Sequence, residues 1–447
     1  MVAVARSRAI RSGPAFFDKP TNNDMTGILP FNPSTTRLDN GLTVIALPVP
    51  SPGLASVWTI VRTGSRDEYE PGRTGFAHFF EHMMFRGTEK YPAERYQQIL
   101  TGLGSDANAY TTDDLTAYHI AGAPADIGTV FEIESDRFMR LDYPEGDFRT
   151  EAGAVYGEYR KDKTEPLFVL YEAMRQKTFA RHTYGHTTLG YEADIAAMPG
   201  MYDYSREFFG RYYRPENAVL LVTGDIEPAA IHDLAATHFG DWAPGYVEPD
   251  VPAEPEQAAQ LRTRAQYDGK TLPLLWHAYR IGRFDPDNRI RVAADLLVQL
   301  AYGETSDVYR QLVLHDQSVE FLAAYTNMNR DPSVLDVYCR IKDPDRISEI
   351  EDRIEQTNAV FREKTVGRNA LAALKSRLRY GFLMGLETPD DVAGALARPL
   401  AISGNLEQLD ALYAAYERVT PDDIQAAANT VLVEQQRTVG ILRGRDD

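Results

Sequence analysis

The apolar pattern of residues 74–85 predicts a helix that is buried on every side. The segments 74–77 and 83–85 place apolar side chains all around a helical wheel, whereas a surface helix keeps one polar face. Within this apolar helix lie His78, Glu81 and His82. Burying these three groups without partners would cost several kcal/mol, so we expect them to share a partner.

The spacing of these three residues indicates what the partner is. His78 and His82 are one helical turn apart, so their rings lie on the same face, and Glu81 lies within about 100° of both. A divalent metal ion on that face would satisfy all three side chains. The order His-x-x-Glu-His inverts the His-Glu-x-x-His motif and is the inverted zincin pattern. Chance matches arise in on the order of one chain in a hundred, so other residues must support the motif.

A later segment supplies candidates for a further metal ligand. A catalytic zinc ion takes three protein ligands and keeps its fourth position for water. Glu151 and Glu158 are two helical turns apart, so a helix would place both carboxylates on one face. The periodicity alone does not decide which of the two is the ligand.

Residues 243–260 are typical of a linker between two domains. They are rich in Pro and acidic residues and have no apolar period. A length of 447 residues with 43% hydrophobic content also favours two domains, each with its own core. We expect an N-terminal arm at 1–27, a metal-binding domain at 28–242, the linker at 243–260, and a second domain without the metal motif at 261–447.

Strand-like phrases of the first half recur in the second half and indicate a duplication. Residues 57–62 have a counterpart at 274–280, and residues 218–225 have one at 438–445. Thr420 and Pro421, followed by two acidic residues, predict a capped helix N-terminus. Short strands and long helices do not alternate one for one, which favours an α+β fold over a doubly wound sheet.

Several phrases of the first half, taken with the metal motif, resemble one peptidase family. These phrases are Thr36–Val44, Gly64–Glu68, Gly87–Thr88, Ser105–Thr111 and residues 212–225. The chain is similar to the pitrilysin-type metallopeptidases, in the subfamily of mitochondrial processing peptidase and its bacterial relatives. In that family Thr36–Val44 corresponds to the first strand. The resemblance implies two homologous domains, each a mixed, mainly antiparallel sheet covered by helices on one face.

The resemblance also implies a role for each residue of the site. Glu151 would support the site without binding metal, and Glu81 would be the base that activates water rather than a ligand. The implied ligands of one zinc ion per chain are His78, His82 and Glu158. The implied residues of an edge strand that holds the backbone of the substrate are Ala107, Asn108 and Ala109.

The activity expected from this site is hydrolysis of peptide bonds by a zinc-dependent endopeptidase. The substrate would be a peptide or small unfolded protein, bound as an added strand in an enclosed chamber. The alternative is a scaffold or interaction subunit of the same fold, which keeps the motif by descent. Metal content together with peptide cleavage distinguishes these two hypotheses.

The second half of the chain predicts that a partner is needed. It contains no His-x-x-Glu-His motif. In full-length members of the resembling family this half supplies an Arg and a Tyr, seven residues apart, that reach the substrate. Here Met384 and Leu386 stand seven residues after Arg377 and Arg379. We expect a heterodimer with a homologous subunit that lacks the metal motif and carries the Arg–Tyr pair, with a homodimer as the alternative.

Composition and charge bear on nucleic-acid binding, membrane insertion and cellular compartment. The net charge of −18 disfavours nucleic-acid binding, which needs a basic face. The sequence contains no apolar run of about eighteen residues, so it predicts no membrane-spanning helix. Its first ten residues lack the apolar stretch of a secretory signal. The single Cys339 fits a reducing compartment, so we expect a cytoplasmic protein, or a periplasmic one if a signal was trimmed. His182 and His186 lie in a polar run with a glycine, which predicts a loop and a structural role.

Overall fold

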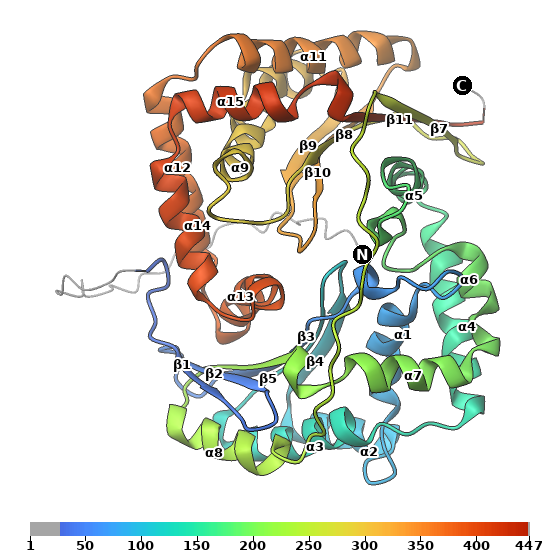
Figure 1. Cartoon of the computed structure of the whole chain (residues 1–447), viewed down its shortest axis with the longest axis vertical. Helices are drawn as coiled ribbons and strands as arrows, with labels where there is room; N and C mark the ends of the chain where they lie inside the picture. Colours follow the sequence, from blue (N-terminus) through green and yellow to red (C-terminus); the bar gives the residue numbers. More distant parts are fainter. Residues whose placement is uncertain (1–26, 446–447) are drawn as a thin grey trace, which may run out of the picture.

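The computed structural model describes residues 27–445, which form two halves that each contain one sheet (Figure 1). The predicted N-terminal arm, residues 1–27, lies outside the described residues except for its last one. The strands of the first half are β1 (Ser34–Arg37), β2 (Thr43–Pro48), β3 (Ala55–Val61), β4 (Asp106–Thr111), β5 (Thr116–Gly122) and β6 (Ala218–Gly224). Those of the second half are β7 (Leu261–Gln266), β8 (Leu274–Ile281), β9 (Val319–Thr326), β10 (Ser333–Ile341) and β11 (Arg437–Arg443).

The two sheets follow the same plan, which confirms the predicted duplicated α+β fold. The first has the order β1-β2-β6-β3-β5-β4, and the second has the order β7-β11-β8-β10-β9. The pairs β2–β6 and β7–β11 are parallel, and every other pair in both sheets is antiparallel. The repeated phrases form β3 and β8, and β6 and β11, which occupy matching places. One expectation was wrong in detail: Thr36–Val44 is the hairpin turn between β1 and β2, not a single strand.

Helices of each half bury one face of that half's own sheet. Seven helices pack into the first core: α1 (Phe76–Met83), α2 (Ala93–Leu103), α3 (Ile127–Arg140), α4 (Glu145–Asp162), α6 (Glu192–Ala197), α7 (Tyr202–Tyr212) and α8 (Pro228–Phe239). The second core is built by α9 (Arg289–Tyr302), α10 (Asp307–Tyr309), α11 (Ile347–Glu363), α12 (Arg368–Met384), α14 (Glu407–Arg418) and α15 (Pro421–Val431). Thr420 caps α15 through a capping box, as predicted.

The other face of each sheet is covered by a helix from the opposite half. Helix α5 (Pro166–Thr178) follows α4 in the chain, but its Leu170 and Met174 pack against Trp276 of β8. In return, α13 (Pro389–Ser403) places Leu396 and Leu400 against β3 and β6 of the first sheet. The halves therefore exchange one helix each, and each sheet is buried on both faces.

The segment between the two halves is anchored at Glu254. Residues 243–260 contain neither helix nor strand and run across the molecule between α8 and β7 (Figure 1). The carboxylate of Glu254 accepts the backbone N–H groups of Ala180, Arg181 and His182 at 2.8–2.9 Å and forms an ion pair with Arg280 at 3.0 Å. A buried anion with four donors restrains the linker strongly. The exact domain limits at 242 and 261 stay a prediction.

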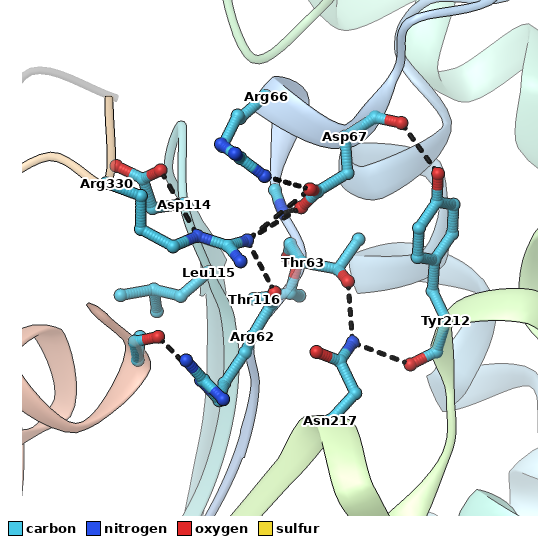
Figure 2. A network of polar contacts seen from close by, with 12 residues as sticks. Arg62, Thr63, Arg66, Asp67, Asp114, Leu115, Thr116, Tyr212, Asn217 and Arg330 are labelled. Carbon is cyan, nitrogen blue, oxygen red and sulfur yellow. Dashed lines mark hydrogen bonds and ion pairs between the residues drawn. The ribbon is translucent and has the colours of Figure 1, made fainter. Parts of the chain in front are cut away.

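A buried ionic network joins the two halves (Figure 2). Arg330, in the loop between β9 and β10, donates to the carbonyl of Arg62 at 2.7 Å. Its guanidinium also lies 3.1 Å from Asp67 and 3.6 Å from Asp114, whose side chains are fully buried. Buried carboxylates are tolerated only with such partners. The second half therefore supplies a charge that the first half needs.

None of the helices within residues 27–445 combines the length and the apolar character needed to cross a bilayer. The longest of the described helices, α4, carries eight charged residues.

We expect the exchanged helix α13 to contribute to the stability of the first half. Leu396 is fully buried, so Leu396→Ala should lower the free energy of unfolding by about 2 to 5 kcal/mol, since it leaves a cavity. Leu54→Ala is the matched control, because Leu54 is 51% exposed and its loss should change this free energy by less than about 0.5 kcal/mol. Chemical denaturation measures both. Equal, small effects would contradict a core role for α13.

Candidate metal centre

Helix α1 is short because two glycines bracket it. Gly75 has φ 94° and Gly87 has φ 88°, a region that favours glycine. A Cβ atom at Gly75 would lie 2.6 Å from the carbonyl oxygen of Leu189, and one at Gly87 would lie 2.4 Å from that of Tyr91. Neither position has room for a side chain. The chain can therefore turn sharply on both sides of the metal motif.

The N-terminus of α1 is fixed by a buried carboxylate. Glu68 accepts the N–H groups of Gly75 and Ala77, both at 2.7 Å, so it satisfies donors that a helix start leaves free. Burial raises the pKa of Glu68 to about 8, although both hydrogen bonds favour the anion. Glu68 follows Asp67 of the ionic network directly, so the network and the helix start are one continuous support.

Three side chains from α1 and α4 converge on one point. The Nε2 atoms of His78 and His82 lie 3.6 Å and 3.4 Å from the same oxygen, Oε2 of Glu158. The ligand atoms of all three residues lie within 4.8 Å of one another. Two imidazole nitrogens and one carboxylate oxygen form the donor set of a catalytic zinc site with an open fourth position. The residues therefore fit the metal that the sequence predicts.

Electrostatics in this cluster depend on the two carboxylates of α4. Burial, followed by the charge of His82, lowers the pKa of His78 to about 4, so His78 is neutral at pH 7. Burial also acts to lower the pKa of His82, but hydrogen bonds to Glu151 and Glu158 outweigh it and raise this pKa to about 9. The hydrogen bond with His82 in turn lowers the pKa of Glu158 to about 2. The carboxylates of α4 thus favour a positive charge on His82, whereas burial keeps His78 neutral.

Glu151 lies behind the cluster and contacts the far side of His82. Its Oε1 atom lies 2.9 Å from Nδ1 of His82, which turns Nε2 toward Glu158. Its Oε2 atom accepts from Nε of Arg86 at 2.5 Å. The geometry thus brings together four predicted residues. His78, His82 and Glu158 face one another, and Glu151 contacts only His82 among them. Contacts of this kind orient metal-binding histidines.

Glu81 is on α1 but outside the converging set. Its Oε2 atom accepts the hydroxyl proton of Thr111, at the end of β4, at 2.8 Å. Burial raises the pKa of Glu81 above its ordinary value, which brings it closer to the range useful for a general base. The carboxylate therefore lies beside the three candidate ligands and is tied to the edge of the sheet.

Strand β4 forms the edge of the first sheet and one wall of a cavity of about 370 Å³. The cavity is lined by Glu81, His82, Phe85, Arg86, Asn108, Ala109 and Glu151. The side-chain Oδ1 of Asn108 accepts the N–H of Ala109 at 2.9 Å, so this amide faces the open edge rather than β5. Ala107 lies two residues earlier on the same strand, half-buried. One candidate ligand, His82, thus shares a cavity with Glu81 and with an edge-facing amide.

Sequence reasoning missed three residues that support the site: Glu68, Arg86 and Thr111. Only Arg86 had a signal, since it stands one turn after His82 on the same helical face. His182 and His186 lie in a loop, as predicted: Nδ1 of His182 accepts the N–H of Tyr184, and Nε2 lies 3.0 Å from Asp331. Glu68 and Thr111 lie in phrases that carry the family resemblance, but their contacts with α1 and Glu81 could not be read from the sequence.

The sequence matches two family models. Residues 44–192 match the model described as "Insulinase (Peptidase family M16)", and residues 202–378 match "Peptidase M16 inactive domain". Zinc protease PqqE of Helicobacter pylori is 26% identical over 423 residues, 93% of either chain. The β subunit of the mitochondrial-processing peptidase of Blastocladiella emersonii is 21% identical over 421 residues, 90% of this chain and 87% of that protein.

The fold is also similar to that of a solved structure. The crystal structure of a protease from Helicobacter pylori matches with a TM-score of 0.87 and 24% identity, over 92% of this chain and 99% of that chain. The first family model includes every candidate metal residue, and the two models together span most of the sequence. The resemblance inferred from the motifs is confirmed: the chain belongs to peptidase family M16.

Proposed function

We propose that the chain is the metal-bearing subunit of a zinc-dependent endopeptidase. The observation that carries this proposal is the convergence of His78, His82 and Glu158 beside Glu81, at the open edge of β4. A scaffold protein has no need for this combination of ligand set, base and free strand edge. Names of relatives such as zinc protease PqqE support the same activity.

The three converging residues would hold one zinc ion per chain, and Glu151 would orient His82 through its Nδ1 atom. When bound, zinc supplies a Lewis acid that polarises a peptide carbonyl and acidifies water. Glu81 would take a proton from the attacking water and return it to the leaving amine. Thr111 holds the Glu81 carboxylate by one oxygen, so the base keeps a fixed position relative to β4.

The substrate would bind as an added strand along β4. The N–H of Ala109 faces the edge and is covered by the side chain of Asn108, which a peptide carbonyl could replace. Main-chain pairing along Ala107 and Ala109 would place a peptide bond next to Glu81. Such pairing is independent of the substrate's side chains, so sequence specificity would be loose.

A homologous partner subunit would complete the enclosure. The relative from Blastocladiella emersonii is itself named as a subunit. In this chain Tyr380 and Met384 of α12 are 62% and 74% exposed, and the Arg–Tyr pair expected near them is absent from the sequence. We propose that a two-domain subunit without the metal motif supplies that pair and closes over the peptide. A homodimer, each copy facing the other's metal site, is the alternative.

The first prediction separates ligands from base. Glu81→Gln should keep about one zinc ion per chain while hydrolysis falls about a hundredfold or more, because proton transfer is lost. His82→Ala and Glu158→Gln should instead lose the metal. Glu145→Gln, on an exposed turn of α4, is the control and should change neither quantity. Elemental analysis and a quenched-peptide assay measure both. Loss of zinc in Glu81→Gln would sink the assignment.

The second prediction concerns the strand edge. Ala109→Pro removes an N–H that does not pair with β5, so the sheet should survive while peptide hydrolysis falls at least about tenfold. Ala109→Ser keeps the amide and serves as the control. Zinc content and melting temperature verify that both variants are folded. Undiminished turnover by Ala109→Pro would mean that peptides bind elsewhere.

The third prediction concerns the partner. Light scattering and turnover of an unstructured peptide should be measured on this chain alone and after adding homologous subunits co-purified from the native source. We expect little turnover alone and a large increase with a two-domain partner in a 1:1 complex. Full activity of the monomer would contradict the proposal, whereas activity confined to a self-associated form would identify the homodimer.

A further inference from the structure

Three side chains on one face of α1 and its continuation contact two carboxylates on α4. His78, His82 and Arg86 stand one turn apart in succession, and the last lies in a short 3-10 turn, Met84–Arg86, that continues α1. His78 and His82 contact Glu158, and His82 and Arg86 contact Glu151. Residue numbers fall along α4 as they rise along α1, so the two helices run antiparallel. Arg86 is the outer end of this row.

Both oxygens of Glu151 are occupied by this row. Oε1 lies 2.9 Å from Nδ1 of His82, and Oε2 lies 2.5 Å from Nε of Arg86. The Glu151 side chain is only 6% exposed, so water contributes little to holding its charge. A carboxylate bound at one oxygen alone could rotate about its last side-chain bond. The guanidinium therefore fixes both the charge and the plane of Glu151.

We propose that Arg86 is a positioning residue for the metal centre: it holds Glu151 in the orientation that keeps Nε2 of His82 pointed at the metal position. This inference rests on the proposed zinc site, but it adds a residue outside the predicted set. Arg86 is 43% exposed and lines the cavity of about 370 Å³, so it is accessible without being a ligand. A side chain that only stabilised the fold would not need to share its carboxylate with a metal-facing histidine.

Helix α4 offers a matched control for this proposal. Arg149 pairs with Glu145 at 2.7 Å, one turn apart on the same helix, and both side chains are more than half exposed. Arg149→Gln removes an arginine–glutamate pair that contacts none of the metal residues. Exposed pairs of this kind contribute little to stability. Any effect of Arg86→Gln that Arg149→Gln lacks therefore reports on the position of Arg86, not on the loss of an arginine.

The test measures zinc affinity by chelator competition in the full chain. We expect Arg86→Gln to raise the zinc dissociation constant about tenfold to a hundredfold, as removal of groups that orient metal ligands does. Arg86→Lys should restore part of the affinity, because it keeps the charge but not the planar fork. Arg149→Gln should change it less than about twofold. An unchanged zinc affinity in Arg86→Gln would overturn the proposal. If Arg86→Gln does not fold, the zinc affinity of Arg86→Lys is compared with that of the wild type instead.

A double-mutant cycle with Glu151→Gln tests the route of the effect. If Arg86 acts through Glu151, adding Arg86→Gln to Glu151→Gln should weaken zinc binding by less than about twofold further. A full additional loss would overturn this route. Wild-type protein that binds zinc but cleaves no peptide in any assembly would remove the proposed peptidase activity while leaving the Arg86 proposal standing. Failure of the proposed peptidase activity and failure of the Arg86 proposal can thus be told apart.

Discussion

The structure depends on one constraint: a buried helix carries two imidazoles and a carboxylate that must all find partners. Burial alone would make those groups costly, and every neighbouring feature of the first half addresses that cost. Helix α4 supplies two carboxylates to the histidines, and β4 supplies a hydroxyl to Glu81. Glu68 fixes the helix start, and glycines permit the turns at both ends. A metal ion held by His78, His82 and Glu158 would supply the partner that these side chains still need.

The helix of the second half that matches α1 also buries charged side chains, but it pairs them with each other. Helix α9 follows β8 as α1 follows β3, yet it carries Arg291 and Asp295 one turn apart. Asp295 also accepts hydroxyl protons from Thr326 at the end of β9 and from Tyr416, much as Glu81 accepts one from Thr111 at the end of β4. The buried guanidinium provides the cation internally. Because the carboxylate of Asp295 is already paired with Arg291 on the same helix, it does not need a metal ion as a counter-charge.

Periodicity predicted features that lie within one element, whereas the family resemblance was needed to join Glu158 to the two histidines. His78, Glu81 and His82 share a single helix, so periodicity alone brought them together. Arg86 continues that face and could have been found by reading one more turn. Thr388 and Pro389 cap α13 with the same signature as that read at Thr420. The exchange of α5 and α13 could not be read, because a helix with apolar residues does not reveal which sheet it will cover.

The exchanged helices and the ionic network make the second half part of the metal site's support. Arg330 neutralises Asp67, and the next residue, Glu68, holds the first turn of α1. The second half thus acts on α1 through two adjacent side chains, Asp67 and Glu68. The second half can therefore support the candidate site without a His-x-x-Glu-His motif of its own. The second sheet repeats the strand order of the first without a counterpart of β1, so the second half offers the same framework as a support for the first.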